Sequence, residues 1–208
     1  MPLVRKPADR SATPTPESSG ALKVLVSGNE EERWAAARSA AEVAGGADAL
    51  AAAARQEESP RVREAIFTSL ARIGTPASAD HLLALLRSDN ANLRTGALDA
   101  LRMMPGAVRE FLPRLLSDPD VDIRVLTCEL TRSLSSDDAT YLLSNLLAGE
   151  QDVNVCAAAI DVLAEVGNRD ALPALAECTR RFHQNAFLTF AIQIAADRIN
   201  NQPPTPRG

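Results

Sequence analysis

The side chains in this sequence that could bind a metal ion or attack a substrate are its cysteines and histidines. Cys128, Cys156 and Cys178 are far apart and show neither a Cys-x-x-Cys motif nor the spacing of zinc ligands. His81 and His183 are also far apart, so they form no histidine pair at ligand spacing. The chain has no P-loop, no Gly-x-Gly-x-x-Gly motif and no Gly-x-Ser-x-Gly motif. We therefore expect a non-enzymatic protein with no metal, no cofactor and no catalytic residue.

Composition and charge exclude several further classes of protein. Of the 208 residues, 46% are hydrophobic and 24% are charged, which is typical of a folded soluble protein. The formal net charge of -5 argues against nucleic acid as a partner, because phosphate contacts need a basic surface. No run of about eighteen apolar residues is present, so we expect no membrane span. An odd number of widely spaced cysteines indicates reduced thiols and a cytoplasmic protein.

Most of the chain consists of repeats of one amphipathic segment. Within each copy the apolar residues recur at helical spacing, and shorter apolar segments lie between the copies, so each repeat predicts a pair of helices. A sixth, divergent copy begins at Gln184. The five clearer copies, which recur at intervals of about 31 residues, are EERWAAARSAAEVAG from Glu31, PRVREAIFTSLARIG from Pro60, ANLRTGALDALRMMP from Ala91, VDIRVLTCELTRSLS from Val121 and VNVCAAAIDVLAEVG from Val153.

The two ends of the chain differ from the repeats. Residues 1–20 are rich in Pro, Ser and Thr without helical periodicity, and residues 202–208 are similar, so we expect disordered tails on either side of one repeat domain at 21–201. Pro113 and Pro173 fall in the shorter segments, where we expect a kink or a late helix start. The predicted fold class is all-α, an α-α superhelix that forms a right-handed solenoid of about six helix pairs.

Several repeat families have two helices and a period near this length. The tetratricopeptide pattern of Trp, Tyr and Phe and the ankyrin TPLH-like turn are both absent. The copies instead resemble the short HEAT-like repeat of the phycobilisome-lyase group, in which an acidic residue or Asn precedes a hydrophobic residue and Arg, and Ile-Gly ends the helix. The matching stretches are DPDVDIR ending at Arg124, DNANLR ending at Arg94, SPRVREAIFTSLARIG ending at Gly74 and DVNVCAAAIDVLAEVG ending at Gly167. The resemblance covers residues 21–200 and implies an architecture more than a function.

One position in the repeat is nearly always arginine. It could form a basic ladder on the surface, but Asn90, Asp120 and Asp152 lie one turn earlier in three copies, which favours a hydrogen-bonded stack between repeats. Cys156 replaces the arginine in the fifth copy and is expected to be partly exposed, with no neighbour that lowers its pKa. Cys128 lies on the apolar stripe and should be an inert, buried thiol. The aligned position is occupied by Arg33, Arg63, Arg94, Arg124 and Cys156.

The surface predicted to bind a partner is the helix face opposite the apolar stripe. The resemblance implies that the second helix of each pair lines the concave side of the stack. Trp and Arg are the residue types most enriched at binding hot spots. The single Trp lies on this face, although it could equally cover the open end of the first repeat. The candidate partner-binding residues are Trp34, Arg38, Arg72, Arg102, Met103, Val125 and Arg132.

The favoured function is a scaffold or adaptor in bacterial regulation or signalling. We expect it to bind a protein partner of unknown identity along the concave face, as a monomer or simple dimer. The resemblance alone implies an alternative, a bilin lyase or isomerase that binds a tetrapyrrole. Such a protein needs an apolar pocket with aromatic or polar clamps, and Trp34 is the only aromatic residue on the predicted face. A HEAT-like nucleic-acid-binding protein is a third reading, disfavoured by the acidic excess.

Overall fold

The computed structural model describes residues 16–201, and every regular element within that range is a helix. The all-α prediction is confirmed. Contacts divide the chain into two compact units. The N-terminal unit takes in the chain up to Leu85 together with Asn90–Ala100, and the C-terminal unit takes in Leu86–Asp89 and the chain from Leu101. The predicted tails lie outside the described residues over 1–15 and 202–208.

The N-terminal unit consists of two layers of helices. One layer contains α2, which packs against α4, and the other contains α1, α3 and α5, which pack in that order. The short η1 helix (Ala40–Glu42) continues the chain after α2. The bounds are α1 (Pro16–Ser27), α2 (Glu30–Ser39), α3 (Gly46–Ala54), α4 (Pro60–Ile73), α5 (Pro76–Leu85) and α6 (Ala91–Arg102), of which the part up to Ala100 belongs to this unit.

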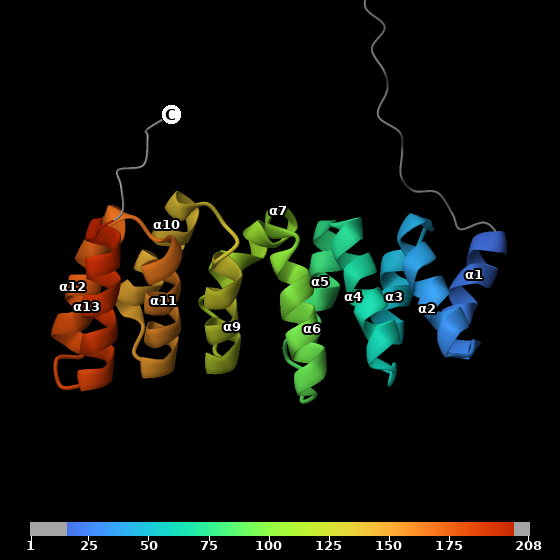
Figure 1. The fold of residues 1–208 in the computed structure, drawn as a ribbon, viewed down its shortest axis with the longest axis horizontal. Helices are drawn as coiled ribbons and strands as arrows, with labels where there is room; N and C mark the ends of the chain where they lie inside the picture. The colour runs from blue at the N-terminus through green and yellow to red at the C-terminus, as the bar shows by residue number, and fades with distance from the viewer. Residues whose placement is uncertain (1–15, 202–208) are drawn as a thin grey trace, which may run out of the picture. The chain divides into compact units, whose positions relative to one another are not determined.

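The C-terminal unit has the same two-layer organisation (Figure 1). In one layer α9 packs against α11 and α11 against α13, while α10 and α12 pack together in the other. Pro113 and Pro173 lie where the helices of the second layer are broken or start late, as predicted. The bounds are α7 (Pro105–Val108), η2 (Arg109–Phe111), α8 (Leu112–Leu115), α9 (Val121–Thr131), α10 (Ser136–Gly149), α11 (Val153–Val166), η3 (Arg169–Ala171), α12 (Leu172–Arg181) and α13 (Ala186–Asn201).

Side-chain caps fix where the helices of the repeated segments begin. Asn29 forms a capping box with Glu32 at the start of α2, and Ser59 caps α4 directly before Pro60. Asp120 and Asp152 accept hydrogen bonds from the first backbone amides of α9 and α11. We call the helices that carry the repeated position the Arg layer; they are α2, α4, α6, α9, α11 and α13.

Two boundaries differ from the sequence prediction. Helix α1 begins at Pro16, so residues 16–20 are helical and the predicted N-terminal tail is too long. Helix α1 is the first helix of the first pair. It could not be predicted from the sequence because its apolar residues show only a weak helical periodicity. The first repeated helix is also shorter than predicted, because α2 ends at Ser39 and the backbone of Gly46 lies against Ala40. Among the described helices, none is long and apolar enough to cross a membrane.

Candidate partner-binding site

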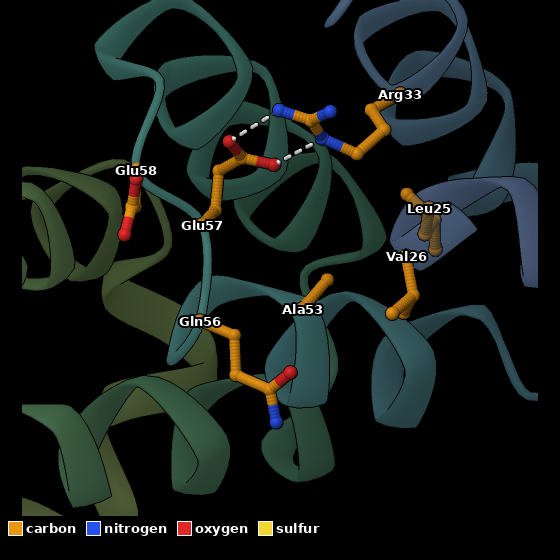
Figure 2. A pocket seen from close by; sticks show the side chains of 7 residues that line it. All are labelled: Leu25, Val26, Arg33, Ala53, Gln56, Glu57 and Glu58. Carbon is orange, nitrogen blue, oxygen red and sulfur yellow. Dashed lines mark hydrogen bonds and ion pairs between the residues drawn. The ribbon is translucent and has the colours of Figure 1, made fainter. Parts of the chain in front are cut away.

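The repeated arginine joins one repeat to the next. Arg33 of α2 donates from Nε to Glu57 Oε2 at 2.8 Å and from Nη2 to Glu57 Oε1 at 2.9 Å. Its Nη1 reaches the carbonyl oxygen of Gly28 at 2.9 Å. Figure 2 shows Arg33 and Glu57 joined by these bonds, with Leu25 and Val26 beside Arg33; all four residues line a small pocket of about 220 Å³. The pair therefore ties α2 to the turn before α4.

The same arrangement recurs in the C-terminal unit. Arg124 of α9 donates from Nε to Glu150 Oε2 at 2.7 Å and from Nη2 to Glu150 Oε1 at 3.1 Å. Its Nη1 donates to the carbonyl oxygen of Asp118 at 2.9 Å. The predicted hydrogen-bonded stack is confirmed at Arg33 and Arg124, but its acceptors are glutamates two residues before the helix caps. Arg63 donates instead to the carbonyl oxygens of Glu57 and Glu58 in the turn before its own helix. Asn90, Asp120 and Asp152, which we expected in the stack, cap their own helices instead.

Both glutamates are buried and remain ionised. The hydrogen bond from Arg33 lowers the pKa of Glu57 below its ordinary value and outweighs the opposing effect of burial. For Glu150, burial acts to raise the pKa, but hydrogen bonds from Arg124 and from the amide of Asp152 outweigh it, so the pKa is lowered. Only 4% of the Glu57 side chain and 7% of the Glu150 side chain are exposed. The repeated arginine is thus a structural residue at these two positions.

The cysteines and His81 occupy structural positions. Burial raises the pKa of Cys128 to about 12, in agreement with the predicted inert thiol. Cys156 is fully buried, so our expectation of partial exposure is wrong; its Sγ donates to the carbonyl oxygen of Glu150 at 3.7 Å. The neighbouring thiol of Cys178, which is also fully buried, and burial itself raise the pKa of Cys156. His81 Nε2 lies 2.8 Å from Asp48 Oδ1. Within residues 16–201 no group of side chains could hold a metal ion.

A groove on the Arg layer of the N-terminal unit brings together three of the predicted binding residues. Trp34 and Arg38 of α2 and Arg72 of α4 line it, and its volume is about 430 Å³. Arg61, which the sequence prediction missed, lines it as well. The other lining residues are Glu64, Ala65, Thr68 and Ser69.

Trp34 lies between two guanidinium groups in this groove. The Cζ atoms of Arg38 and Arg61 are 4.7 Å and 4.5 Å from the centroid of its ring. Arg61 also pairs with Glu31 at 2.6 Å. Arg61 stands two positions before the repeated arginine of α4, so it lies on the face of α4 that corresponds to the face of α2 on which Trp34 lies. A helical wheel that included the preceding turn would have predicted it.

Arg72 and Arg38 are held differently. Arg72 lies 3.6 Å from Glu42 and donates to the carbonyl oxygen of Arg38. Arg38 forms no ion pair with any residue of the described range, and its contact with the Trp34 ring is its main polar interaction there. The groove therefore presents an aromatic ring and a cluster of positive charge on a chain whose net charge is negative.

The remaining predicted binding residues lie in the C-terminal unit, where they do not form one pocket. Met103 is exposed and Val125 is half-buried. Arg102 pairs with Glu129 at 2.9 Å. Arg132 is the centre of a larger network, because it binds Asp161 at 2.8 Å as well as Glu129 and Glu165. Both arginines are thus engaged within the fold.

Comparisons with protein families and with solved structures place the chain among repeat proteins. A family model described as HEAT repeats matches residues 18–102 and 108–184. No curated protein matches the sequence. Among solved structures, the chain is similar to TOG3 of Mini spindles from Drosophila melanogaster at 15% identity, with 90% of this chain and 97% of that chain covered and a TM-score of 0.54.

Two further solved structures extend the comparison. Cex1p is 15% identical, and the match covers 88% of this chain but 42% of Cex1p, with a TM-score of 0.51. The complex of CpcE and CpcF of phycocyanin lyase from Nostoc is 17% identical, with 95% and 100% covered and a TM-score of 0.38. Similarities at this level concern the fold alone.

Proposed function

The chain belongs to the HEAT-repeat family, and from this premise we propose that it is a non-enzymatic scaffold that holds an acidic segment of a partner protein in the groove of its N-terminal unit. The observation that carries this proposal is the position of Trp34 between Arg38 and Arg61. Trp and Arg side chains that lie together in a hollow are the residue types that dominate the binding energy of protein interfaces.

The charge of the groove favours an acidic occupant. Three arginines and a single carboxylate, Glu64, line it. Two of these arginines already pair with exposed glutamates, Glu31 and Glu42. Exposed ion pairs of this kind contribute about 0–1 kcal/mol each, so a carboxylate of the partner can replace either glutamate at little cost. Arg38 forms no ion pair within the described residues, so a carboxylate of the partner can bind its guanidinium without displacing a glutamate.

The residues that line the groove fit a peptide segment. They all come from two adjacent helices, α2 and α4. Thr68 and Ser69 supply hydroxyl groups that can bind the main chain of a peptide. Trp34 supplies the apolar surface that an aliphatic or aromatic side chain between two acidic residues would cover.

The single Trp of the chain makes this proposal directly testable. We would titrate the protein with a fluorescein-labelled peptide of alternating Glu and Leu and follow both the fluorescence of Trp34 and the anisotropy of the peptide. We expect binding that quenches or shifts the Trp fluorescence. Trp34→Ala and Arg38→Ala should each weaken binding by about tenfold or more, as hot-spot residues do.

A matched control uses an arginine of the same unit outside the groove. Arg55 follows α3 and is exposed, so Arg55→Ala removes the same charge and should change the affinity by less than about twofold. If Arg55→Ala and Arg38→Ala weakened peptide binding equally, net charge alone would explain the effect, and the proposal of a specific groove would be refuted. A second experiment is a titration of the protein with a free bilin, followed by absorbance. If binding at Trp34 shifted the bilin spectrum, the tetrapyrrole-binding function would be supported and the peptide proposal would be abandoned.

A further inference from the structure

The last helix of the chain exposes large apolar side chains. Phe187 and Phe190 of α13 are each 67% exposed, and Ile194 is 38% exposed. Their spacing places all three on one face of the helix. The opposite side of α13 is buried in the core through Leu188 and Ile192. Exposed aromatic side chains of this size are unusual on a helix that already has a buried face.

These residues extend a row that crosses the Arg layer of the C-terminal unit. Asp120, Asp152 and Asn185 are the N-terminal caps of α9, α11 and α13, and counting five residues from each cap gives Val125, Ala157 and Phe190. Val125 and Ala157 are partly exposed. Since α9 packs on α11 and α11 on α13, the three positions lie next to one another. We call Val125, Ala157, Phe187, Phe190 and Ile194 the apolar band.

The band is not the face of α13 that corresponds to the buried face of α11. Cys156 and Ile160 of α11, four and eight residues after its cap, are buried. The same count from the cap gives Thr189 and Gln193 in α13, which are polar, and Gln193 donates to Asp197 at 2.9 Å. The phenylalanines lie on a different face and are not explained by stacking.

Carboxylates border the apolar band toward the C-terminal end of α11. Asp161 and Glu165 of α11 are both exposed, at 71% and 58% of their side-chain surface, and they share the single guanidinium of Arg132. Burial disfavours the charge of Arg132, but hydrogen bonds from it to Asp161 and Glu129 outweigh this effect and raise its pKa. Because Glu129 also pairs with Arg102, three carboxylates face two arginines, which leaves one net negative charge at the edge of the band.

We propose that the apolar band is a second docking surface, which binds an amphipathic helix of a partner whose polar face carries lysine or arginine. The apolar residues of such a helix would cover Phe187, Phe190 and Val125, and its basic residues would meet Asp161 and Glu165. Neighbouring helix axes are about 9 Å apart, so a partner helix that reaches from α9 across α11 to α13 spans about 18 Å and needs at least about 12 residues at 1.5 Å per residue. This surface is separate from the groove of the proposed function, which lies in the other unit.

The test uses a labelled peptide of about 15 Leu and Lys residues, with Leu at the i, i+3, i+4 and i+7 positions of an amphipathic helix. We expect binding by anisotropy, with a gain of helical circular dichroism, and a loss of affinity of about tenfold or more for the Phe187→Ala/Phe190→Ala variant. Asp161→Asn together with Glu165→Gln should weaken binding and reduce its dependence on salt concentration.

The control variant is Tyr141→Ala, because Tyr141 is an equally exposed aromatic residue, at 69%, on α10 in the other layer of the same unit. It should leave the affinity within about twofold of the original. Binding that survives the double Phe variant, the absence of binding, or equal binding of a Leu and Glu peptide would overturn the proposal. Sedimentation of the protein alone tests a further outcome. A dimer that dissociates in the Phe190→Ala variant would show that the band binds a second copy of the chain instead of a partner helix.

Discussion

The pair of Arg124 and Glu150 illustrates how single side chains hold adjacent repeats together. Glu150 accepts hydrogen bonds from Arg124 and from the backbone amides of Gln151 and Asp152, so all of its acceptor capacity is directed at the junction between α9 and α11. A buried carboxylate that loses its cation keeps its desolvation cost without compensation. Arg124 therefore stabilises the junction chiefly by compensating the buried charge of Glu150.

Replacing that arginine tests the structural role. Arg124→Ala should lower the free energy of unfolding by about 2–3 kcal/mol, because Glu150 is left buried without its partner. Urea denaturation followed by circular dichroism measures this change. Arg180→Ala is the control, since Arg180 is 74% exposed and pairs only with Glu177 on its own helix, and it should cost less than about 0.5 kcal/mol. Equal stability of the Arg124→Ala variant and the original protein would contradict the structural role.

The lowered pKa values of Glu57 and Glu150 predict how stability depends on pH. A carboxyl group whose pKa is lower in the folded state than its ordinary value of 4.5 stabilises the fold above that value, and the contribution is lost as pH falls through the folded-state pKa. Stability should therefore decline below about pH 4.5. In Glu150→Gln the decline should be shallower, so denaturant midpoints of the two proteins should converge on acidification. Parallel curves from neutral to acidic pH would refute this linkage.

At the scale of helices, the close approach of α4 and α6 depends on one glycine. A Cβ atom at Gly96 would lie 2.3 Å from Cε2 of Phe67, whose ring is buried and cannot swing aside freely. Alanine raises helix propensity by about 1 kcal/mol over glycine, but overpacking of a filled core costs about 1–3 kcal/mol. The steric effect should therefore dominate.

The pair of variants Gly96→Ala and Gly149→Ala separates these two effects. Gly96→Ala should destabilise the protein by about 1–2 kcal/mol, whereas Gly149→Ala, at the end of α10 with no atom within 4 Å of the added Cβ, should be neutral or slightly stabilising. Thermal denaturation of both variants checks the signs. A rise in melting temperature for Gly96→Ala would show that α6 can move away from Phe67.

Much of the arrangement of helices could be predicted from the sequence, because the repeated Arg and the cap residues recur at fixed spacing. The sequence did not predict α1, whose apolar pattern is weak, nor the glutamate acceptors, which belong to the next repeat and are brought to the arginine only by folding. Cys156 was misplaced for a related reason: it lies in a core that residues of other helices, such as Cys178, complete only on folding. The helical periodicity of the sequence predicts which residues share one face of a helix, but it does not identify the residues that they contact on neighbouring helices.

At the scale of the whole molecule, the candidate binding residues fall into two groups of opposite character. Trp34, Arg38 and Arg72 line one basic groove in the N-terminal unit. In the C-terminal unit, Arg102 and Arg132 are paired with acids, and the exposed apolar side chains come from α13, beyond the five copies from which the predicted face was taken. The predicted binding residues therefore do not form one site: three of them line the groove, and the exposed apolar side chains of α13 lie outside the predicted face.

The two surfaces share no residue, which predicts that they act independently. Trp34→Ala should weaken binding of the acidic peptide and leave the affinity for the basic amphipathic peptide within about twofold, and Phe190→Ala should do the reverse. Binding of the basic peptide to the original protein should also leave the fluorescence of Trp34 unchanged, because no residue of the apolar band lines the groove around Trp34. Anisotropy titrations of both single variants and of the Trp34→Ala/Phe190→Ala double variant measure the coupling between the two positions. A double variant whose losses differ from the sum of the single ones by more than about 0.5 kcal/mol would show that one partner contacts both surfaces, and the chain would then bind a single extended ligand in place of two.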